Sequence, residues 1–251
     1  MANPYSYSIF FDFIESYQPS GFLNIKTDDP IILELEQLME VNDQYFQVFD
    51  LGQMRFLYTS KGITKIVGVT PQEINPGHYT QIVHPEDEER LGLVRTLVYK
   101  MEKEIFQAKK GSALASYNIR FYYPEDVLIN LFAQDYMFYS SVPYKAVFMI
   151  QVVTKIDWFQ FRKNKFHHYA GKNISLFKFP DHELLSLGPD LSHREYEIIR
   201  LIESGLCSKE IADKLHISVH TVNTHRSNML EKAGKPLISE LIYDLKEKGL
   251  L

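Results

Sequence analysis

In KEIADKLHISVHTVNTHRSNML, residues 209–230, two helix-like segments flank a break at residues 216–218. Four of the six residues from Val219 to Thr224 are β-branched, and such side chains are poor helix formers because a helix restricts their rotamers. The second helix must therefore depend on packing against its neighbours. Its outward face is mixed and polar, which indicates that this face contacts another molecule.

The start and stop signals around this stretch predict four short helices. Ser192-His193-Arg194-Glu195 is a capping box, and Ser208 and Ser218 are the expected N-caps of the second and third helices. Gly205 and Gly234 are suitable stops for the first and third helices. The fourth helix is expected over about 237–248. Residues 188–251 are thus predicted to form an all-α helix-turn-helix domain.

The third helix carries the side chains that favour contact with DNA. If Val222, Met229 and Ala233 point inward, short hydroxyl and amide groups point outward, and these can bond to phosphates or to base edges. The N-terminus of the helix adds N–H groups for a phosphate. The outward positions are His220, Thr221, Asn223, Thr224, Ser227 and Asn228, with Arg226 at the flank.

A resemblance to a known family supports this interpretation. Residues 191–234, LSHREYEIIRLIESGLCSKEIADKLHISVHTVNTHRSNMLEKAG, are similar to the LuxR-type DNA-binding domain, whose recognition helix enters the major groove. The resemblance implies base-facing roles for Asn223, Thr224 and Ser227. It implies backbone contacts by Lys209, Ser218, His220, Thr221, Arg226 and Lys232.

Asn223 departs from the family pattern, in which lysine is common at this position. The absence of one positive charge predicts weaker non-specific attraction to DNA. The dependence of affinity on salt should be shallower by about one unit of slope for each phosphate that the protein no longer neutralises.

Residues 44–154 show a different order of elements. Two strand-like runs (45–51 and 54–60) join at Gly52-Gln53, and three more strands are expected over 113–123, 127–139 and 144–154. Helices are expected between these groups, one after the Thr70–Glu73 capping box and a longer one from His84. This order is not the alternation that is typical of a parallel sheet.

The same region resembles a PAS domain. Its phrase TQIVHPEDEERL, residues 80–91, is similar to the entry of that family into its long helix. The resemblance implies a five-stranded antiparallel sheet with helices across one face. We therefore expect an α+β class for the chain, with the all-α helix-turn-helix domain at its C-terminal end.

The flanking segments complete the expected domain plan. Residues 1–43 form an N-terminal extension with a helix from Pro30, capped by Asp29. This helix either covers the sheet or forms a dimer. Residues 155–187 form a basic, aromatic-rich connector between the PAS-like sensor domain (44–154) and the C-terminal domain.

Aromatic residues of the PAS-like domain suit a ligand cavity or a solid core, and the sequence leaves both open. The candidates for a pocket that takes a small apolar ligand are Phe46, Phe56, Tyr58, Phe121, Phe132 and Phe148. Flavin–cysteinyl photochemistry is not expected, because the single cysteine, Cys207, lies in the other domain. Haem is not expected either, since His78 is assigned to a loop and His84 to the helix entry. The lone pair His167-His168 is too little for a metal site.

Composition narrows the class of protein further. The 251 residues include 17 Phe and 16 Tyr, enough for a real core, and carry a net charge of −5. DNA binding must therefore depend on local geometry. The sequence lacks G-x-S-x-G, H-E-x-x-H and a glycine-rich phosphate loop, so no enzyme is expected. One cysteine and no apolar run of ~18 residues predict a cytoplasmic protein without a membrane span.

These observations predict a sequence-specific DNA-binding transcriptional regulator that acts as a homodimer on double-stranded DNA. Its PAS-like domain would sense a signal or mediate dimerisation. The alternative is a signalling adaptor that contacts other proteins and does not bind DNA. A phosphorylated response regulator is not favoured, because its receiver domain needs repeated βα units.

Overall fold

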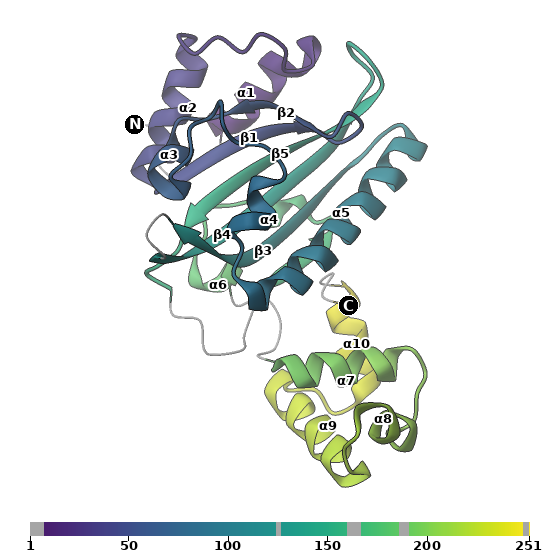
Figure 1. Ribbon diagram of the computed structural model, residues 1–251. Coiled ribbons are helices and arrows are strands. Elements are labelled where there is room, and N and C mark those ends of the chain that lie inside the picture. The colour runs from purple at the N-terminus through teal and green to yellow at the C-terminus, as the bar shows by residue number, and fades with distance from the viewer. Residues whose placement is uncertain (1–7, 124–126, 160–166, 186–190, 248–250) are drawn as a thin grey trace. The chain divides into compact units, whose positions relative to one another are not determined.

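The computed structural model describes residues 8–123, 127–159, 167–185, 191–247 and 251. The chain divides into two units (Figure 1). The sheet unit comprises the described residues of 1–159 and 170–181, and the helical unit those of 160–169 and 182–251. The predicted α+β class with a C-terminal helical part is confirmed. The predicted boundary at 187/188 lies outside the described residues.

The sheet has the strand order β2-β1-β5-β4-β3-β6, and the pairs β1–β2, β1–β5, β4–β5 and β3–β4 are antiparallel. Its strands are β1 (Gln44–Asp50), β2 (Arg55–Thr59), β3 (Ser112–Tyr123), β4 (Val127–Ser140), β5 (Ala146–Lys155) and β6 (His168–Gly171). The prediction of five strands was short by one. The four residues of β6 lie in the predicted connector, where aromatic and basic residues do not alternate in the manner of a strand.

Helices lie across one face of this sheet, as predicted (Figure 1). They are α3 (Gly62–Val67), α4 (His78–Ile82), the 3-10 turn Pro85–Asp87 and the long α5 (Glu88–Ala108). Leu91, Val94, Val98 and Ile105 form the buried stripe of α5. This stripe packs on the sheet and fixes the position of the helix.

The helix predicted after Thr70 is a turn instead. The Glu73 carboxylate accepts hydrogen bonds from the backbone N–H and the hydroxyl of Thr70, at 2.9 and 2.7 Å, so the capping contacts do form. The helix does not continue because Asn75-Pro76-Gly77 follows at once. A proline disfavours the helical conformation in the residue before it, and glycine weakens a helix further.

The opposite face of the sheet is covered by the N-terminal segment, which contains α1 (Ser8–Tyr17), the 3-10 turn Gln18–Ser20 and α2 (Pro30–Val41). Asp29 caps α2 as predicted, since its Oδ1 accepts from the N–H of Ile31 at 2.9 Å. Phe13 packs against Phe46 of β1 with ring centroids 5.4 Å apart. This is the sheet-covering role, one of the two left open by the sequence.

The helical unit holds α7 (His193–Glu203), α8 (Ser208–Leu215), α9 (Val219–Ala233) and α10 (Ile238–Glu247), preceded by the short α6 (His182–Leu185). Its core is formed by fully buried Ile198, Ile199, Ile211, Val222, Met229, Leu241 and Leu245. The Ser192 capping box is present as predicted. The N-cap of α8 is Cys207 rather than Ser208, and its N–H donates to Glu210 Oε2 at 2.7 Å. Serine is a preferred N-cap residue and cysteine is not, so the prediction from residue type placed this cap one residue too late.

Candidate nucleic-acid interface and sensor cavity

The first turn of α9 is held by its own serine cap. Ser218 Oγ accepts from the N–H of Thr221 at 3.0 Å, and the two hydroxyls lie 2.8 Å apart. Val222 and Met229 are fully buried on the inner side. The helix therefore presents a fixed outward face, on which Ser218, His220, Asn223, Thr224, Ser227 and Asn228 are exposed and Thr221 and Arg226 are half-buried.

Two local contacts arrange the side chains of this face. Arg226 Nη1 lies 3.5 Å from the Ser208 hydroxyl at the start of α8, so its charge lies beside that turn, next to the exposed Lys209. The Thr224 hydroxyl donates to the His220 carbonyl at 3.0 Å. Asn223 and Ser227 lie one helical turn apart, on the same side of α9.

Lys232 has a different environment from the other predicted contact residues. Its ammonium lies 2.6 and 2.8 Å from the two carboxylate oxygens of Glu195 on α7. The Glu195 side chain is only 2% exposed, whereas that of Lys232 is 36% exposed. Lys232 therefore serves as the partner of a buried carboxylate, and its phosphate contact stays a prediction. The two residues are 37 positions apart, and no local pattern shows such a pair.

Glu195 is ionised at neutral pH because its partners outweigh its burial. Burial raises the pKa of its carboxyl, but the Lys232 ammonium and the N–H and hydroxyl of Ser192 lower it, with a net pKa below the usual range. The ion pair thereby links Glu195 on α7 to Lys232 near the C-terminal end of α9.

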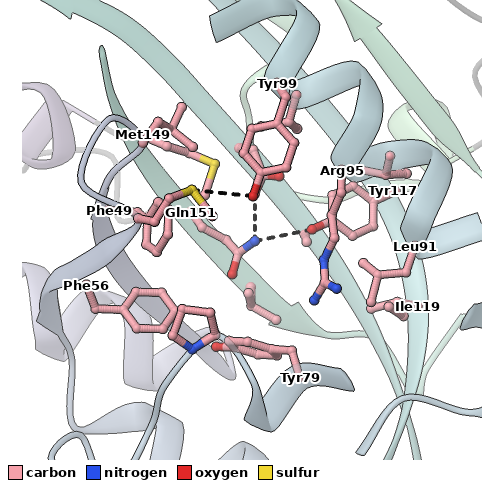
Figure 2. A pocket seen from close by; sticks show the side chains of 18 of the residues that line it. Phe49, Phe56, Tyr79, Leu91, Arg95, Tyr99, Tyr117, Ile119, Met149 and Gln151 are labelled. Carbon is pink, nitrogen blue, oxygen red and sulfur yellow. Dashed lines mark hydrogen bonds between the residues drawn. The ribbon is translucent and has the colours of Figure 1, made fainter. Parts of the chain in front are cut away.

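A cavity of about 360 Å³ lies in the sheet unit, between α5, the β1–β2 connection and the face of the sheet under α5 (Figure 2). Its walls are mostly apolar and include Phe49, Phe56, Leu91, Phe121 and Met149. Two lining residues, Met54 and Tyr99, are 48% and 41% exposed. Tyr99 donates a weak hydrogen bond to the Met54 sulfur at 3.5 Å, so these two side chains mark the mouth of the cavity.

The cavity is lined by two of the six predicted pocket residues, Phe56 and Phe121. Phe46, Tyr58, Phe132 and Phe148 do not line it and belong to the aromatic layer on the opposite face, which corrects the predicted set. Phe46 packs on Tyr58 with centroids 5.4 Å apart, and Phe148 on Phe22 at 5.1 Å. Successive strand residues point to opposite faces, so a list by residue type mixes the two sides.

The floor of the cavity carries polar side chains that the sequence analysis missed. Asp135 on β4 and Gln151 on β5 are cross-strand partners. Gln151 Nε2 donates to Asp135 Oδ1 at 2.7 Å and to the Tyr117 hydroxyl at 3.2 Å. Every second residue of a strand faces the same side, so counting back four positions from Phe121 on β3 would have placed Tyr117 on the cavity face.

Charged groups approach the cavity from two sides. Asp135 is 2% exposed. Burial raises its pKa to about 7, although hydrogen bonds from Gln151 and Tyr117 act in the opposite direction. Arg95, on α5, is half-buried and points into the cavity near Tyr117 (Figure 2). Among the described residues, no acidic side chain forms an ion pair with Arg95 or a basic one with Asp135.

The histidines considered for haem do not line this cavity. His84 accepts a hydrogen bond from the N–H of Glu86 at 3.2 Å, and His78 bonds to the Asn75 side chain at 2.8 Å. In the described residues, no three metal-binding side chains come together. Helices of the described ranges are also too short or too polar to span a membrane.

Comparisons with known proteins agree with the geometry of the helical unit. The family model for bacterial regulatory proteins of the luxR family matches residues 189–242. The Fimbriae Z protein of Escherichia coli K12 is 54% identical over 52 residues, 21% of this chain and 25% of that protein. The oxygen regulatory protein NreC of Staphylococcus aureus JH9 is 48% identical over 61 residues, 24% of this chain and 28% of that protein. The chain thus spans about a quarter of the length of these relatives.

Solved structures resemble the chain more weakly and over a greater length. The Vibrio cholerae VqmA dimer without target DNA is 15% identical, over 86% of this chain and 88% of that one, with a TM-score of 0.40. A PAS domain from Colwellia psychrerythraea is 15% identical, over 51% of this chain and 99% of that one, with a TM-score of 0.35. The capped α9 lies within residues 189–242, the segment that matches the family model for bacterial regulatory proteins of the luxR family.

Proposed function

We propose that this protein is a sequence-specific DNA-binding transcriptional regulator in which α9 is the recognition helix. The observation that carries the proposal is the outward face of α9, an exposed polar surface on a helix whose inner side is fully buried. Asn223, Thr224 and Ser227 would face the base edges. Lys209, Ser218, His220, Thr221 and Arg226 would contact the phosphates.

The local physics of α9 favours this role. Its first turn leaves backbone N–H groups near the Ser218 cap, where a phosphate is stabilised by the helix dipole. An exposed asparagine can pair with adenine through two hydrogen bonds. The positive charges of Lys209 and Arg226 lie together near the start of α8, so a chain with a net charge of −5 still offers a local basic edge.

The double variant Asn223→Ala plus Arg226→Ala tests the recognition helix. We expect it to bind DNA at least about tenfold more weakly, because it can no longer bond to one base and one phosphate. The duplex would be selected from a random library with the unaltered protein, and binding measured by gel shift.

A matched control for this experiment is Arg200→Ala. Arg200 is an exposed arginine of α7 that has no predicted contact with DNA. It should bind within about twofold of the unaltered protein, as expected for a distant surface charge. Equal binding by all three proteins would remove α9 from the interface. If the unaltered protein selects no duplex, the adaptor alternative would take the place of this proposal.

A single substitution tests the departure from the family pattern. Asn223→Lys adds one positive charge to the exposed face of α9. We expect the slope of log K against log salt to become steeper by about one unit, because one more counterion is released. Titrations at four salt concentrations would measure it. An unchanged slope would show that residue 223 lies away from the phosphates.

We further propose that the cavity of the sheet unit receives a small-molecule signal and that the protein acts as a homodimer. A dimer would place two recognition helices on half-sites ~34–36 Å apart or at a multiple of that distance. The cavity supports the signal proposal because it combines apolar walls with a few converging polar groups, which is typical of ligand sites.

A further inference from the structure

We propose that the cavity selects a small, flat, largely apolar molecule with an N–H donor that hydrogen-bonds to Asp135, such as an amino-substituted nitrogen heteroaromatic. This inference rests on the proposed role of the cavity as a receptor and names the chemical class of its ligand.

The size and walls of the cavity favour a compact aromatic molecule. Its volume of about 360 Å³ is near the lower end of the range of roughly 300–1,000 Å³ for ligand pockets. Phe49 and Phe56 meet edge to face with centroids 5.0 Å apart, and Tyr79 lies 5.6 Å from Phe121. Ring edges and faces are therefore presented to the interior, and these suit a flat aromatic ligand.

The requirement for a hydrogen-bond donor on the ligand comes from Asp135. It lines the cavity, is 2% exposed, and is held in place by Gln151 at 2.7 Å. An ionised carboxylate offers about four acceptor positions, and Gln151 and Tyr117 account for two donors to it. Burial of the remaining charge is costly unless a donor or cation neutralises it. A ligand N–H, neutral or protonated, would provide that donor.

The raised pKa of Asp135, about 7, agrees with this requirement. It shows that the donors of the protein itself stabilise the carboxylate only in part at neutral pH. A cationic or strongly donating ligand would stabilise the ionised form and lower this pKa on binding.

Arg95 raises the competing prospect of an anionic ligand. Arg95 is half-buried as a residue, whereas Asp135 is 2% exposed, so burial disfavours the charge of the carboxyl more strongly than that of the guanidinium. The carboxyl therefore restricts the ligand more strongly than the guanidinium does, and Arg95 is free to bind an acceptor at the far edge of the same molecule.

Three probes of similar size test the inference on the full chain. They are 2-aminopyridine, which offers N–H donors, toluene, which offers none, and benzoate, which is an anion. Affinities would be measured by ligand-observed NMR at pH 7. We expect 2-aminopyridine to bind about tenfold or more tightly than either other probe, as is usual for a hydrogen bond to a charged group.

Two variants assign the recognition to a side chain. Asp135→Asn should abolish the preference for 2-aminopyridine while it leaves toluene binding unchanged. Arg95→Met should keep the preference. If Asp135→Asn does not fold, the ranking of the three probes by the unaltered protein still decides, because it needs no variant.

The other outcomes overturn the inference in distinguishable ways. Equal binding of toluene and 2-aminopyridine would leave an apolar receptor without donor recognition. Preference for benzoate, abolished in Arg95→Met, would make the site an anion site. If no probe binds, the receptor role itself fails, while gel shifts with the same protein preparation report separately on α9.

Discussion

Replacement of Asp87 by asparagine is expected to lower the free energy of unfolding of the sheet unit by about 3 kcal/mol. Asp87 is 2% exposed at the entry to α5. Its Oδ1 lies 2.7 Å from Arg120 Nη2, and its Oδ2 accepts from the Nε and the backbone N–H of Arg120 at 3.0 and 2.9 Å. Arg90 Nη2 approaches the same Oδ2 at 3.0 Å. One carboxylate thus joins α5 to β3.

The loss of stability arises because Arg90 and Arg120 would keep their positive charges without the carboxylate that neutralises them. Burial lowers the pKa of Arg90 to about 10, although Asp87 opposes that shift. Asparagine would remove the negative charge that lies between the positive charge of Arg120 and that of Arg90, whose side chain is 16% exposed. Removal of one partner from a buried ion pair is far more costly than loss of an exposed one.

Urea unfolding followed by the fluorescence of the single tryptophan, Trp158, would measure the effect in the unit that contains it. Glu86→Gln is the matched control. Glu86 pairs with the same Arg120 at 3.0 Å, but its side chain is 72% exposed. We expect this control to change the free energy of unfolding by less than about 1 kcal/mol. Equal effects of the two variants would contradict the central role of Asp87.

The Asp87 variant should also alter the response to acid. Burial raises the pKa of the Asp87 carboxyl, but Arg120 and Arg90 outweigh burial and hold it below the usual value. Because the folded pKa is depressed, this stabilisation is complete above the unfolded pKa of about 3.9 and is lost as the pH falls through the folded pKa. Asp87→Asn should lack this component of the acid dependence.

The second large effect is expected at Lys232. Lys232→Met would leave the buried Glu195 carboxylate without its ammonium, and we expect the helical unit to lose about 2–3 kcal/mol of stability. This loss is at or below the low end of the ~3–5 kcal/mol that removal of one partner of a buried ion pair costs. It is small because the Lys232 side chain is 36% exposed. The loss should appear in thermal unfolding followed by circular dichroism.

Lys246→Met provides the control for this prediction. Lys246 pairs with Glu203 at 2.8 Å, but the two side chains are 51% and 33% exposed. The control should change stability by less than about 1 kcal/mol. If Lys232→Met weakened DNA binding without loss of stability, the residue would be a phosphate contact after all, and our structural assignment would fail.

The helical unit was largely predictable because its signals are local. The Ser192 box and the Ser218 cap each join residues three positions apart, so the sequence contains both partners within one turn. Cys207 shows the limit, since its cap uses a backbone N–H that any residue supplies. The Lys232–Glu195 pair was not predictable, because only the fold brings α7 and the end of α9 together.

The cavity was less predictable for a related reason. The choice between Phe56 and Phe46, or between Phe121 and Phe132, depends on strand register, and a shift of one residue reverses the face. Asp135 and Gln151 meet only because β4 and β5 pair in one register. Arg95 lies on α5, and no pattern in the sequence indicates which strands this part of the helix will face. Prediction from residue type alone therefore identified some of the aromatic wall residues of the cavity, Phe56 and Phe121, and missed the polar residues of its floor.

The aromatic layer beneath α1 and α2 bears on how such a protein can be assembled in evolution. Phe13 and Phe22 are fully or almost fully buried against Phe46 and Phe148. A gene fragment that began at β1 would encode a sheet with a bare aromatic face, prone to aggregation. A module that recombination moved as one unit would therefore have to begin at α1, so that the N-terminal helices stay with the sheet.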